Sequence, residues 1–321
     1  MTRDDKGNPL PAVDLLAEVQ TLLKHADSAL HSAKRAGMPV TVFDRSEEPG
    51  SIRRLALLNE LQQALARQEL ELRLQPMVDL RTGRVTRAQA QVTWRRGADG
   101  VRIPVELIEL AEHSGLIQPL TKWVLGEAGR AAQALSTDDQ RVVVTARMSM
   151  RSLEDPELAD FVDTLVRGGE LVPGQVELEV TEDELNEDPA TAAEVLGRFA
   201  AAGVRFAIAD FGSGYAVLST LAHLPLGGLK IDRTFVATLA TSHSDAAIVR
   251  SIVDLAHELG MTVTAEGVAD AAALARLVEF GCDHAQGFHL SEAVPLVDLT
   301  ARVAELETAV RGWIGSRSVD A

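Results

Sequence analysis

The chain has 321 residues and a formal net charge of −16 at pH 7. Hydrophobic residues make up 46% of it and charged residues 24%, which is typical of a globular protein with one large core or two smaller ones. The acidic excess argues against nucleic acid as the main partner, because binding to a phosphate backbone depends on clustered Lys and Arg. The single cysteine, Cys282, excludes an intrachain disulfide. Since the sequence carries neither a signal-peptide pattern nor a run of about 20 apolar residues, we expect a cytoplasmic chain without a membrane segment.

The N-terminal segment predicts one helix followed by one short strand. Small and apolar residues recur at helical spacing before Gly37, at Leu22, Ala26, Ala29, Leu30 and Ala33. Residues 39–44 (PVTVFD) then favour a strand. One helix and one strand cannot close a core of their own. We therefore interpret residues 1–50 as the C-terminal remnant of another domain with its linker, and residues 51–315 as a separate domain.

From about residue 52 the chain alternates between predicted strands and predicted helices. The first two strands are joined by a segment that contains Thr82-Gly83, which predicts a hairpin, whereas helical patterns separate the later strands. Several middle strands are apolar on both faces, as buried parallel strands are. The predicted fold is therefore α/β, a TIM-like (β/α)8 barrel with one antiparallel strand at its start. The strands are expected at residues 71–79, 84–94, 141–147, 175–181, 204–210, 227–232, 261–266 and 283–288.

Three helices between these strands carry clear boundary signals. Thr191 and Glu194 have the spacing of a capping box, which predicts a helix that begins there and ends at Gly203. Residues 245–259 show the clearest amphipathic pattern. Asp270 is expected to cap a further helix.

Polar residues collect at the carboxyl ends of the predicted strands, where the working groups of such a barrel lie. Converging carboxylates suit divalent cations and phosphate-bearing ligands, and Lys230 suits a phosphate or a developing charge. Some of these side chains can instead serve as loop caps or rim ion pairs. The set consists of Glu179, Thr181, Glu182, Asp210, Lys230, Asp232, Glu266 and Gln286.

Seven stretches of the chain, in order, resemble the EAL domain, the cyclic-di-GMP phosphodiesterase family. They cover roughly residues 55–300 with spacing like that of the family, and the longest is FAIADFGSGYAVLSTL at 206–221. The resemblance implies two divalent metals that activate a water molecule, which cleaves cyclic-di-GMP to linear pGpG. The other stretches are LQPMVDLRTGRV (74–85), IELAEHSGLI (108–117), ELEVTE (177–182), LPLGGLKIDRTFV (224–236), TAEGV (264–268) and GCDHAQGF (281–288).

Residues 22–44 are similar to the last helix and strand of a GGDEF domain, the diguanylate cyclase family. The signature loop of that family is absent from this chain, so no cyclase activity is implied. The resemblance implies that the chain is part of a longer GGDEF–EAL protein.

Three metal-binding positions of the EAL family are changed. The glutamate of the E-A-L signature is Gln89, the asparagine of the V-N-L-S stretch is Arg147, and the first aspartate of the D-D-F-G stretch is Ala209. Two carboxylates are lost and one cation is gained, which opposes the binding of Mg²⁺ or Mn²⁺. Losing the ligands that create the nucleophile should cost more than the ~10²–10⁴-fold typical of a lost general acid or base. We therefore expect no metal cofactor and no phosphodiesterase activity.

Other family positions are retained or replaced in ways that bear on ligand binding. Against nucleotide binding, the family's arginine before Trp94 is Thr93, and a family cation after the Q-G-[FY] motif is Glu292. The vestigial catalytic positions are Glu179, Asp210, Lys230 and Glu266. The expected ligand-binding positions are Gln75, Pro76, Arg147, Glu179, Asp210, Lys230, Asp232, Glu266 and Gln286. The expected loop-supporting positions are Glu182, Phe211, Gly212, Ser213 and Gly214.

The sequence favours a catalytically inactive EAL domain that binds cyclic-di-GMP and passes the signal to a protein partner. One alternative is a protein-interaction scaffold that binds no nucleotide, and a second is a residual cyclic-di-GMP phosphodiesterase. We also expect a homodimer through the Asp210–Leu218 loop and the helix after it. EAL domains commonly pair there, and the run from Ala216 to Leu218 is apolar.

Arg147 has two predicted roles at the end of its strand. Its guanidinium can donate two hydrogen bonds to a phosphate, in place of the missing metals. It can instead form an ion pair with Glu179 or Asp210 and close the pocket. The ion pair is favoured in the empty state, because an unpaired buried arginine is costly.

Overall fold

The computed structural model of the chain describes residues 48–94, 101–102, 108, 111–112, 114–212 and 221–317. The chain divides into two units, Met1–Glu60 and Leu61–Ala321. In the first unit the described residues belong to helix α2 (Glu48–Ala66).

Two of the sequence predictions fall outside the described residues. One is the GGDEF remnant at residues 22–44. The other is most of the expected dimer loop, including Ser213 and Gly214.

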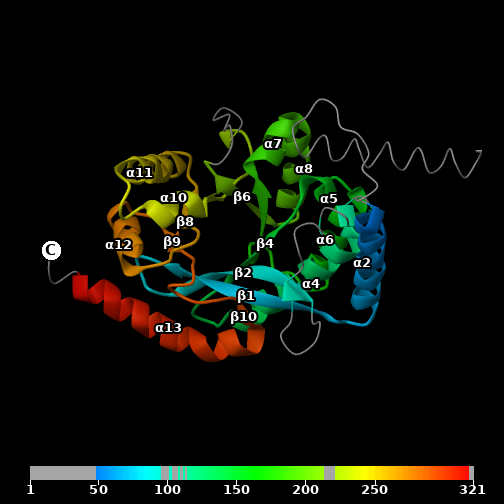
Figure 1. The fold of residues 1–321 in the computed structure, drawn as a ribbon, viewed down its shortest axis with the longest axis horizontal. Coiled ribbons are helices and arrows are strands. Elements are labelled where there is room, and N and C mark those ends of the chain that lie inside the picture. Colours follow the sequence, from blue (N-terminus) through cyan, green and yellow to red (C-terminus); the bar gives the residue numbers. More distant parts are fainter. Residues whose placement is uncertain are drawn as a thin grey trace, which may run out of the picture. The chain divides into compact units, whose positions relative to one another are not determined.

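In the second unit, eight strands close into a barrel (Figure 1). Each strand pairs with the next in the order β1-β2-β4-β5-β6-β7-β8-β9, and β9 pairs back to β1. Two short strands, β3 (Val101–Arg102) and β10 (Val294–Pro295), extend this sheet beside β2 and β1. The predicted fold class is confirmed. The barrel strands are β1 (Leu70–Asp79), β2 (Val85–Trp94), β4 (Val143–Arg147), β5 (Val176–Thr181), β6 (Arg205–Phe211), β7 (Gly228–Ile231), β8 (Thr262–Ala265) and β9 (His284–Ala285).

The first strand has the opposite direction to the other seven. β1 is antiparallel to both β2 and β9, whereas every pairing from β2 and β4 round to β8 and β9 is parallel. The turn between β1 and β2 contains Gly83 at φ +68°, a left-handed backbone conformation that glycine adopts without strain. The predicted hairpin is therefore confirmed.

Helices surround the barrel and connect its parallel strands (Figure 1). Helix α13 runs beside β1, β2 and β10. Asp270 caps α12 as predicted, because its side chain accepts a hydrogen bond from the Ala273 backbone nitrogen. The helices are α4 (Ile117–Leu135), α5 (Met150–Leu153), α6 (Pro156–Arg167), α7 (Glu182–Glu187), α8 (Pro189–Ala201), α10 (Arg233–Thr238), α11 (His243–Glu258), α12 (Ala271–Glu279) and α13 (Leu296–Arg317).

The predicted capping box at Thr191 is wrong. Helix α8 begins at Pro189, and its N-cap is Asp188, whose carboxylate accepts a hydrogen bond from the Thr191 backbone nitrogen at 3.1 Å. Proline suits the first helical position because its φ is already helical and it has no N–H to satisfy, so the helix starts two residues earlier. The capping box lies one helix earlier, between Thr181 and Glu184.

The interior of the barrel is lined by polar as well as small side chains. Glu177 and Glu179 of β5 alternate with apolar residues, which is the two-residue period of a strand. Glu177 contacts Arg87 of β2, and Glu179 contacts Lys230 of β7. Because β5 pairs with neither of those strands, both contacts cross the inside of the barrel. The two glutamates therefore point inward at different levels.

Within the described residues, no helix is both long enough and apolar enough to cross a membrane.

Candidate functional site

Glu179 lies at the centre of a polar cluster at the carboxyl ends of the parallel strands. Its side chain is 1% exposed, and both of its oxygens accept hydrogen bonds. The Lys230 Nζ donates to both oxygens at 3.0 and 3.1 Å. Thr145 Oγ1 donates to Oε1 at 2.5 Å, and Gln89 Nε2 donates to Oε2 at 2.8 Å. The carboxylate of Glu179 is thus fully surrounded by donors of this chain.

Lys230 joins Glu179 to Glu266. Its Nζ lies 3.3 Å from Glu266 Oε2, and its side chain is 3% exposed. Burial lowers the pKa of Lys230, but the charges of Glu179 and Glu266 raise it by more, so the ammonium stays charged. Burial raises the pKa of Glu179, yet the Lys230 charge and the hydrogen bonds it accepts leave it below its usual value. The pair is therefore ionised in the interior.

Four glutamines form a hydrogen-bonded chain beside this pair. Gln286 Nε2 donates to Gln89 Oε1 at 2.6 Å and to Gln75 Oε1 at 2.8 Å. Gln91 Nε2 donates to Gln75 Oε1 at 3.1 Å. Glu179 accepts a hydrogen bond from the Gln89 amide nitrogen, so the Gln89 amide oxygen faces Gln286. The orientation of the amide groups along the chain therefore follows from this one carboxylate. Two of the four, Gln75 and Gln286, are predicted ligand-binding positions, and Gln89 stands at a family metal position.

Arg147 forms an ion pair with Asp210 and has no hydrogen bond to Glu179. Burial lowers the pKa of Arg147, but the hydrogen bond and charge of Asp210, with the charges of Glu179 and Glu266, raise it overall. The Arg147 side chain is half exposed. Asp210 has φ +54°, a left-handed conformation that is uncommon for a residue with a side chain. Of the two predicted partners for Arg147, the structure places it on Asp210.

Glu182, one of the expected loop-supporting residues, contacts the loop that follows β6. Its Oε2 accepts a hydrogen bond from the Gly212 backbone nitrogen at 3.0 Å, and the residue is 2% exposed. Gly212 has φ +97°, and a Cβ there would lie 2.9 Å from the Phe235 ring, so only glycine fits. Phe211 is buried beside it.

A cavity of about 880 Å³ opens above the glutamine chain. It lies within the size range of small-molecule sites. Gln75, Gln89, Arg147 and Glu266 line it, and Phe288 also lines it with 76% of its surface exposed. An exposed aromatic ring at the edge of a largely apolar cavity provides a stacking surface for a planar ligand.

Some expected site residues have structural roles instead of lining the cavity. Asp232 caps α10 through hydrogen bonds from the backbone and hydroxyl of Thr234. Pro76 is buried in β1, where it pairs with Ala88. Thr181 caps α7.

Three residues of the site were missed by the sequence analysis. Gln91 and Thr145 each lie two residues from a predicted position on the same strand, so the two-residue period could have identified both. Phe288 is the last residue of the Q-G-[FY] motif, so that motif could have identified it, although the exposure of its side chain is set by the fold.

The residues at this site do not fit a divalent cation. The carboxylate oxygens of Glu179 already accept hydrogen bonds from Lys230, Thr145 and Gln89. The carboxylate of Asp210 is paired with Arg147, and that of Glu266 is paired with Lys230. Divalent cations such as Mg²⁺ need anionic oxygens that are not already engaged by protein cations. Among the described residues, no group of three or more His, Cys, Asp or Glu side chains is placed to hold a metal ion.

Comparisons with known proteins agree with the fold and the motifs. The family model of the EAL domain matches residues 58–293. The cyclic di-GMP phosphodiesterase NbdA of Pseudomonas aeruginosa is 36% identical over 284 residues, which are 88% of this chain and 36% of that protein. The bifunctional diguanylate cyclase/cyclic di-GMP phosphodiesterase MucR of the same organism is 35% identical and covers 88% of this chain and 42% of that protein. The chain thus spans less than half the length of these two relatives.

Solved structures give the same result. The PaMucR phosphodiesterase in complex with c-di-GMP superposes with a TM-score of 0.70 at 36% identity, over 76% of this chain and 99% of that chain. The EAL domain of Mycobacterium smegmatis DcpA has a TM-score of 0.61 at 31% identity, over 74% of this chain and 97% of that chain.

Proposed function

Because this chain belongs to the EAL domain family, we propose that it acts in cyclic-di-GMP signalling as a receptor that binds the nucleotide without cleaving it. The relatives named as phosphodiesterases and the neighbour solved with c-di-GMP support the nucleotide as the ligand. The receptor passes the signal to a protein partner and forms a homodimer.

The loss of cleavage rests on the charges at the barrel mouth. An amide at Gln89, a guanidinium at Arg147 and a methyl group at Ala209 stand where the family has oxygen ligands of a metal. The surviving Glu179 is neutralised by Lys230 at 3.0 Å. With no metal to lower the pKa of a water molecule, no hydroxide forms to attack the phosphodiester at neutral pH.

The observation that carries the receptor function is the open cavity above these substitutions. The glutamine amides line it and offer hydrogen bonds to a ligand, and Phe288 offers a surface for a base. A scaffold that binds no nucleotide has no need for a cavity of about 880 Å³ lined by these groups.

Titration calorimetry with cyclic-di-GMP in EDTA tests this function. A dissociation constant at or below about 1 µM supports the receptor, whereas no heat up to ~1 mM supports the scaffold. Phe288→Ala is expected to weaken binding about 5-fold or more, since base stacking contributes ~1–3 kcal/mol. Val297→Ala, which truncates another exposed apolar side chain outside the cavity lining, is the matched control and should leave the affinity unchanged.

A further inference from the structure

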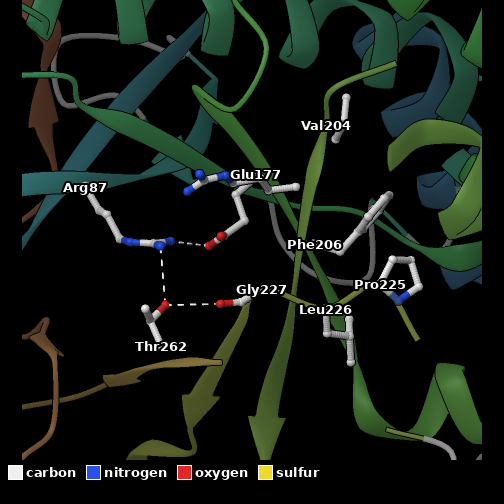
Figure 2. A pocket seen from close by; sticks show the side chains of 9 residues that line it. Arg87, Glu177, Val204, Phe206, Pro225, Leu226, Gly227 and Thr262 are labelled. Carbon is white, nitrogen blue, oxygen red and sulfur yellow. Dashed lines mark hydrogen bonds and ion pairs between the residues drawn. The ribbon is translucent and has the colours of Figure 1, made fainter. Parts of the chain in front are cut away.

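A second cavity, of about 370 Å³, lies where the parallel strands of the barrel begin (Figure 2). It shares no lining residue with the cavity at the carboxyl ends of the strands. Its lining comes from β2, β5, β8, the start of β6 and the segment before β7. The residues are Arg87, Glu177, Val204, Arg205, Phe206, Pro225, Leu226, Gly227 and Thr262.

An ion pair is buried at this end of the barrel. Arg87 Nη1 lies 2.5 Å from Glu177 Oε1, and their side chains are 8% and 3% exposed. Arg87 Nη2 also reaches Thr262 Oγ1 at 3.4 Å, and that hydroxyl donates to the Gly227 carbonyl at 3.3 Å (Figure 2). A buried ion pair of this kind is not needed for stability, because apolar residues of similar volume often serve equally well. Its presence beside a cavity calls for a functional reason.

Each partner of the pair has hydrogen-bonding capacity left. Glu177 Oε2 is buried and has no hydrogen-bond partner among the described residues. The Arg87 guanidinium has five N–H groups, and the described residues provide acceptors for two. Arg205 adds a second cation at the exposed edge of the cavity. The cavity thus offers one acceptor for a cationic group and several donors for an anionic group.

Apolar side chains form one part of the remaining lining. Pro225 is exposed and Leu226 half-buried, and these two form an apolar wall, whereas Phe206 is fully buried with its ring against Phe199. Figure 2 shows Phe206, Pro225 and Leu226 on the side away from Arg87. An apolar wall opposite a pair of opposite charges suits a ligand with a zwitterionic end and an apolar end.

We propose that this cavity binds a free α-amino acid with an apolar side chain. Its ammonium group donates to Glu177 Oε2, its carboxylate accepts from Arg87 and Arg205, and its side chain packs against the wall formed by Pro225 and Leu226. A simple anion would meet the carboxylate of Glu177, and a simple cation would meet the two arginines. Only a ligand with both charges satisfies both groups.

The test uses L-leucine and L-phenylalanine as probes, titrated into the whole chain and followed by calorimetry and saturation-transfer NMR. At least one is expected to bind with a dissociation constant of about 1 mM or tighter. For the amino acid that binds, the N-acetyl derivative lacks the ammonium and the amide derivative lacks the carboxylate. Each is expected to bind at least about 10-fold more weakly, because each loses a charged hydrogen bond.

Two variants connect the binding to this cavity. Leu226→Trp fills the space without touching the ion pair and is expected to abolish binding of the amino acid. Ile248→Trp makes a similar change at an exposed position on α11 and should leave binding intact. Absence of binding for both amino acids up to ~10 mM, equal binding of the modified ligands, or an unchanged affinity in Leu226→Trp would each overturn the proposal. Binding of cyclic-di-GMP at the other cavity has no bearing on this outcome.

Discussion

Gln89 donates a hydrogen bond to Glu179 at 2.8 Å, so an amide and a carboxylate meet at the level where the EAL family binds a metal between two acidic side chains. The contact works because one partner is neutral and donates an N–H. This hydrogen bond from Gln89 helps the barrel mouth to stay folded, because Glu179 is surrounded by donors of the chain itself.

A glutamate at position 89 should therefore make the stability of the barrel mouth depend on a bound metal. Gln89→Glu alone places two carboxylates together, and in EDTA at pH 7.5 it is expected to lower the free energy of unfolding by about 3 kcal/mol. The triple variant Gln89→Glu/Arg147→Asn/Ala209→Asp removes the opposing cation and restores the ligands, so Mn²⁺ should raise its melting temperature. Thermal unfolding with and without Mn²⁺ measures this. An equal Mn²⁺ effect on the unmodified chain would mean that its residues already bind the metal.

Removing Lys230 should be strongly destabilising. Lys230→Met leaves Glu179 buried without its cation, and breaking such a pair costs about 3–5 kcal/mol, measured by urea unfolding. The double variant Lys230→Met/Glu179→Gln removes both charges and is expected to recover most of this loss. If the single variant is as stable as the unmodified chain, the pair does not hold the site together.

Arg147→Ala distinguishes the two roles of this arginine. Since the structure pairs it with Asp210 at the edge of the cavity, we expect it to block the pocket in the empty state. The variant should then bind cyclic-di-GMP as well as or better than the unmodified chain by calorimetry. A loss of ~1.5–3 kcal/mol in binding free energy would instead show that Arg147 donates to the phosphate.

His284 is expected to make stability depend on pH below neutrality. Burial, followed by the charge of Arg87, lowers the pKa of His284 to about 4 from an ordinary value of 6.5. Between pH 6.5 and 4, His284 is protonated in the unfolded chain but not in the folded chain. The free energy of unfolding is therefore at its full value above pH 6.5 and falls by about 3 kcal/mol as the pH drops toward 4.

Urea unfolding between pH 7.5 and 4.5 measures this effect. His284→Gln should flatten the pH dependence, whereas His223→Gln, which removes an exposed histidine, should keep it. If the free energy of unfolding changes equally with pH in the unmodified chain and both variants, groups other than His284 cause the pH dependence.

The sequence predicted the barrel and the positions of its strand ends better than it predicted the contacts between side chains of different strands. The alternation of strands and helices and the Thr82-Gly83 turn are local patterns, and both predictions are confirmed. The ion pair between Arg87 and Glu177 could not be predicted from local patterns, because the two residues are 90 positions apart and meet only across the closed barrel. The sequence predicted an ion pair of Arg147 with Glu179 or Asp210, but the choice of Asp210 depends on side-chain conformations, which no sequence period specifies.

One measurement tests the central claim of binding without cleavage. Equal amounts of protein and cyclic-di-GMP are incubated with Mn²⁺, the protein-bound fraction is isolated, and its nucleotide is released and identified by chromatography. We predict that the bound nucleotide is intact cyclic-di-GMP and that no pGpG forms, because Gln89, Arg147 and Ala209 replace the ligands that a metal needs. Accumulation of pGpG at the per-second rates ordinary for enzymes, or a bound fraction without nucleotide, would contradict the account.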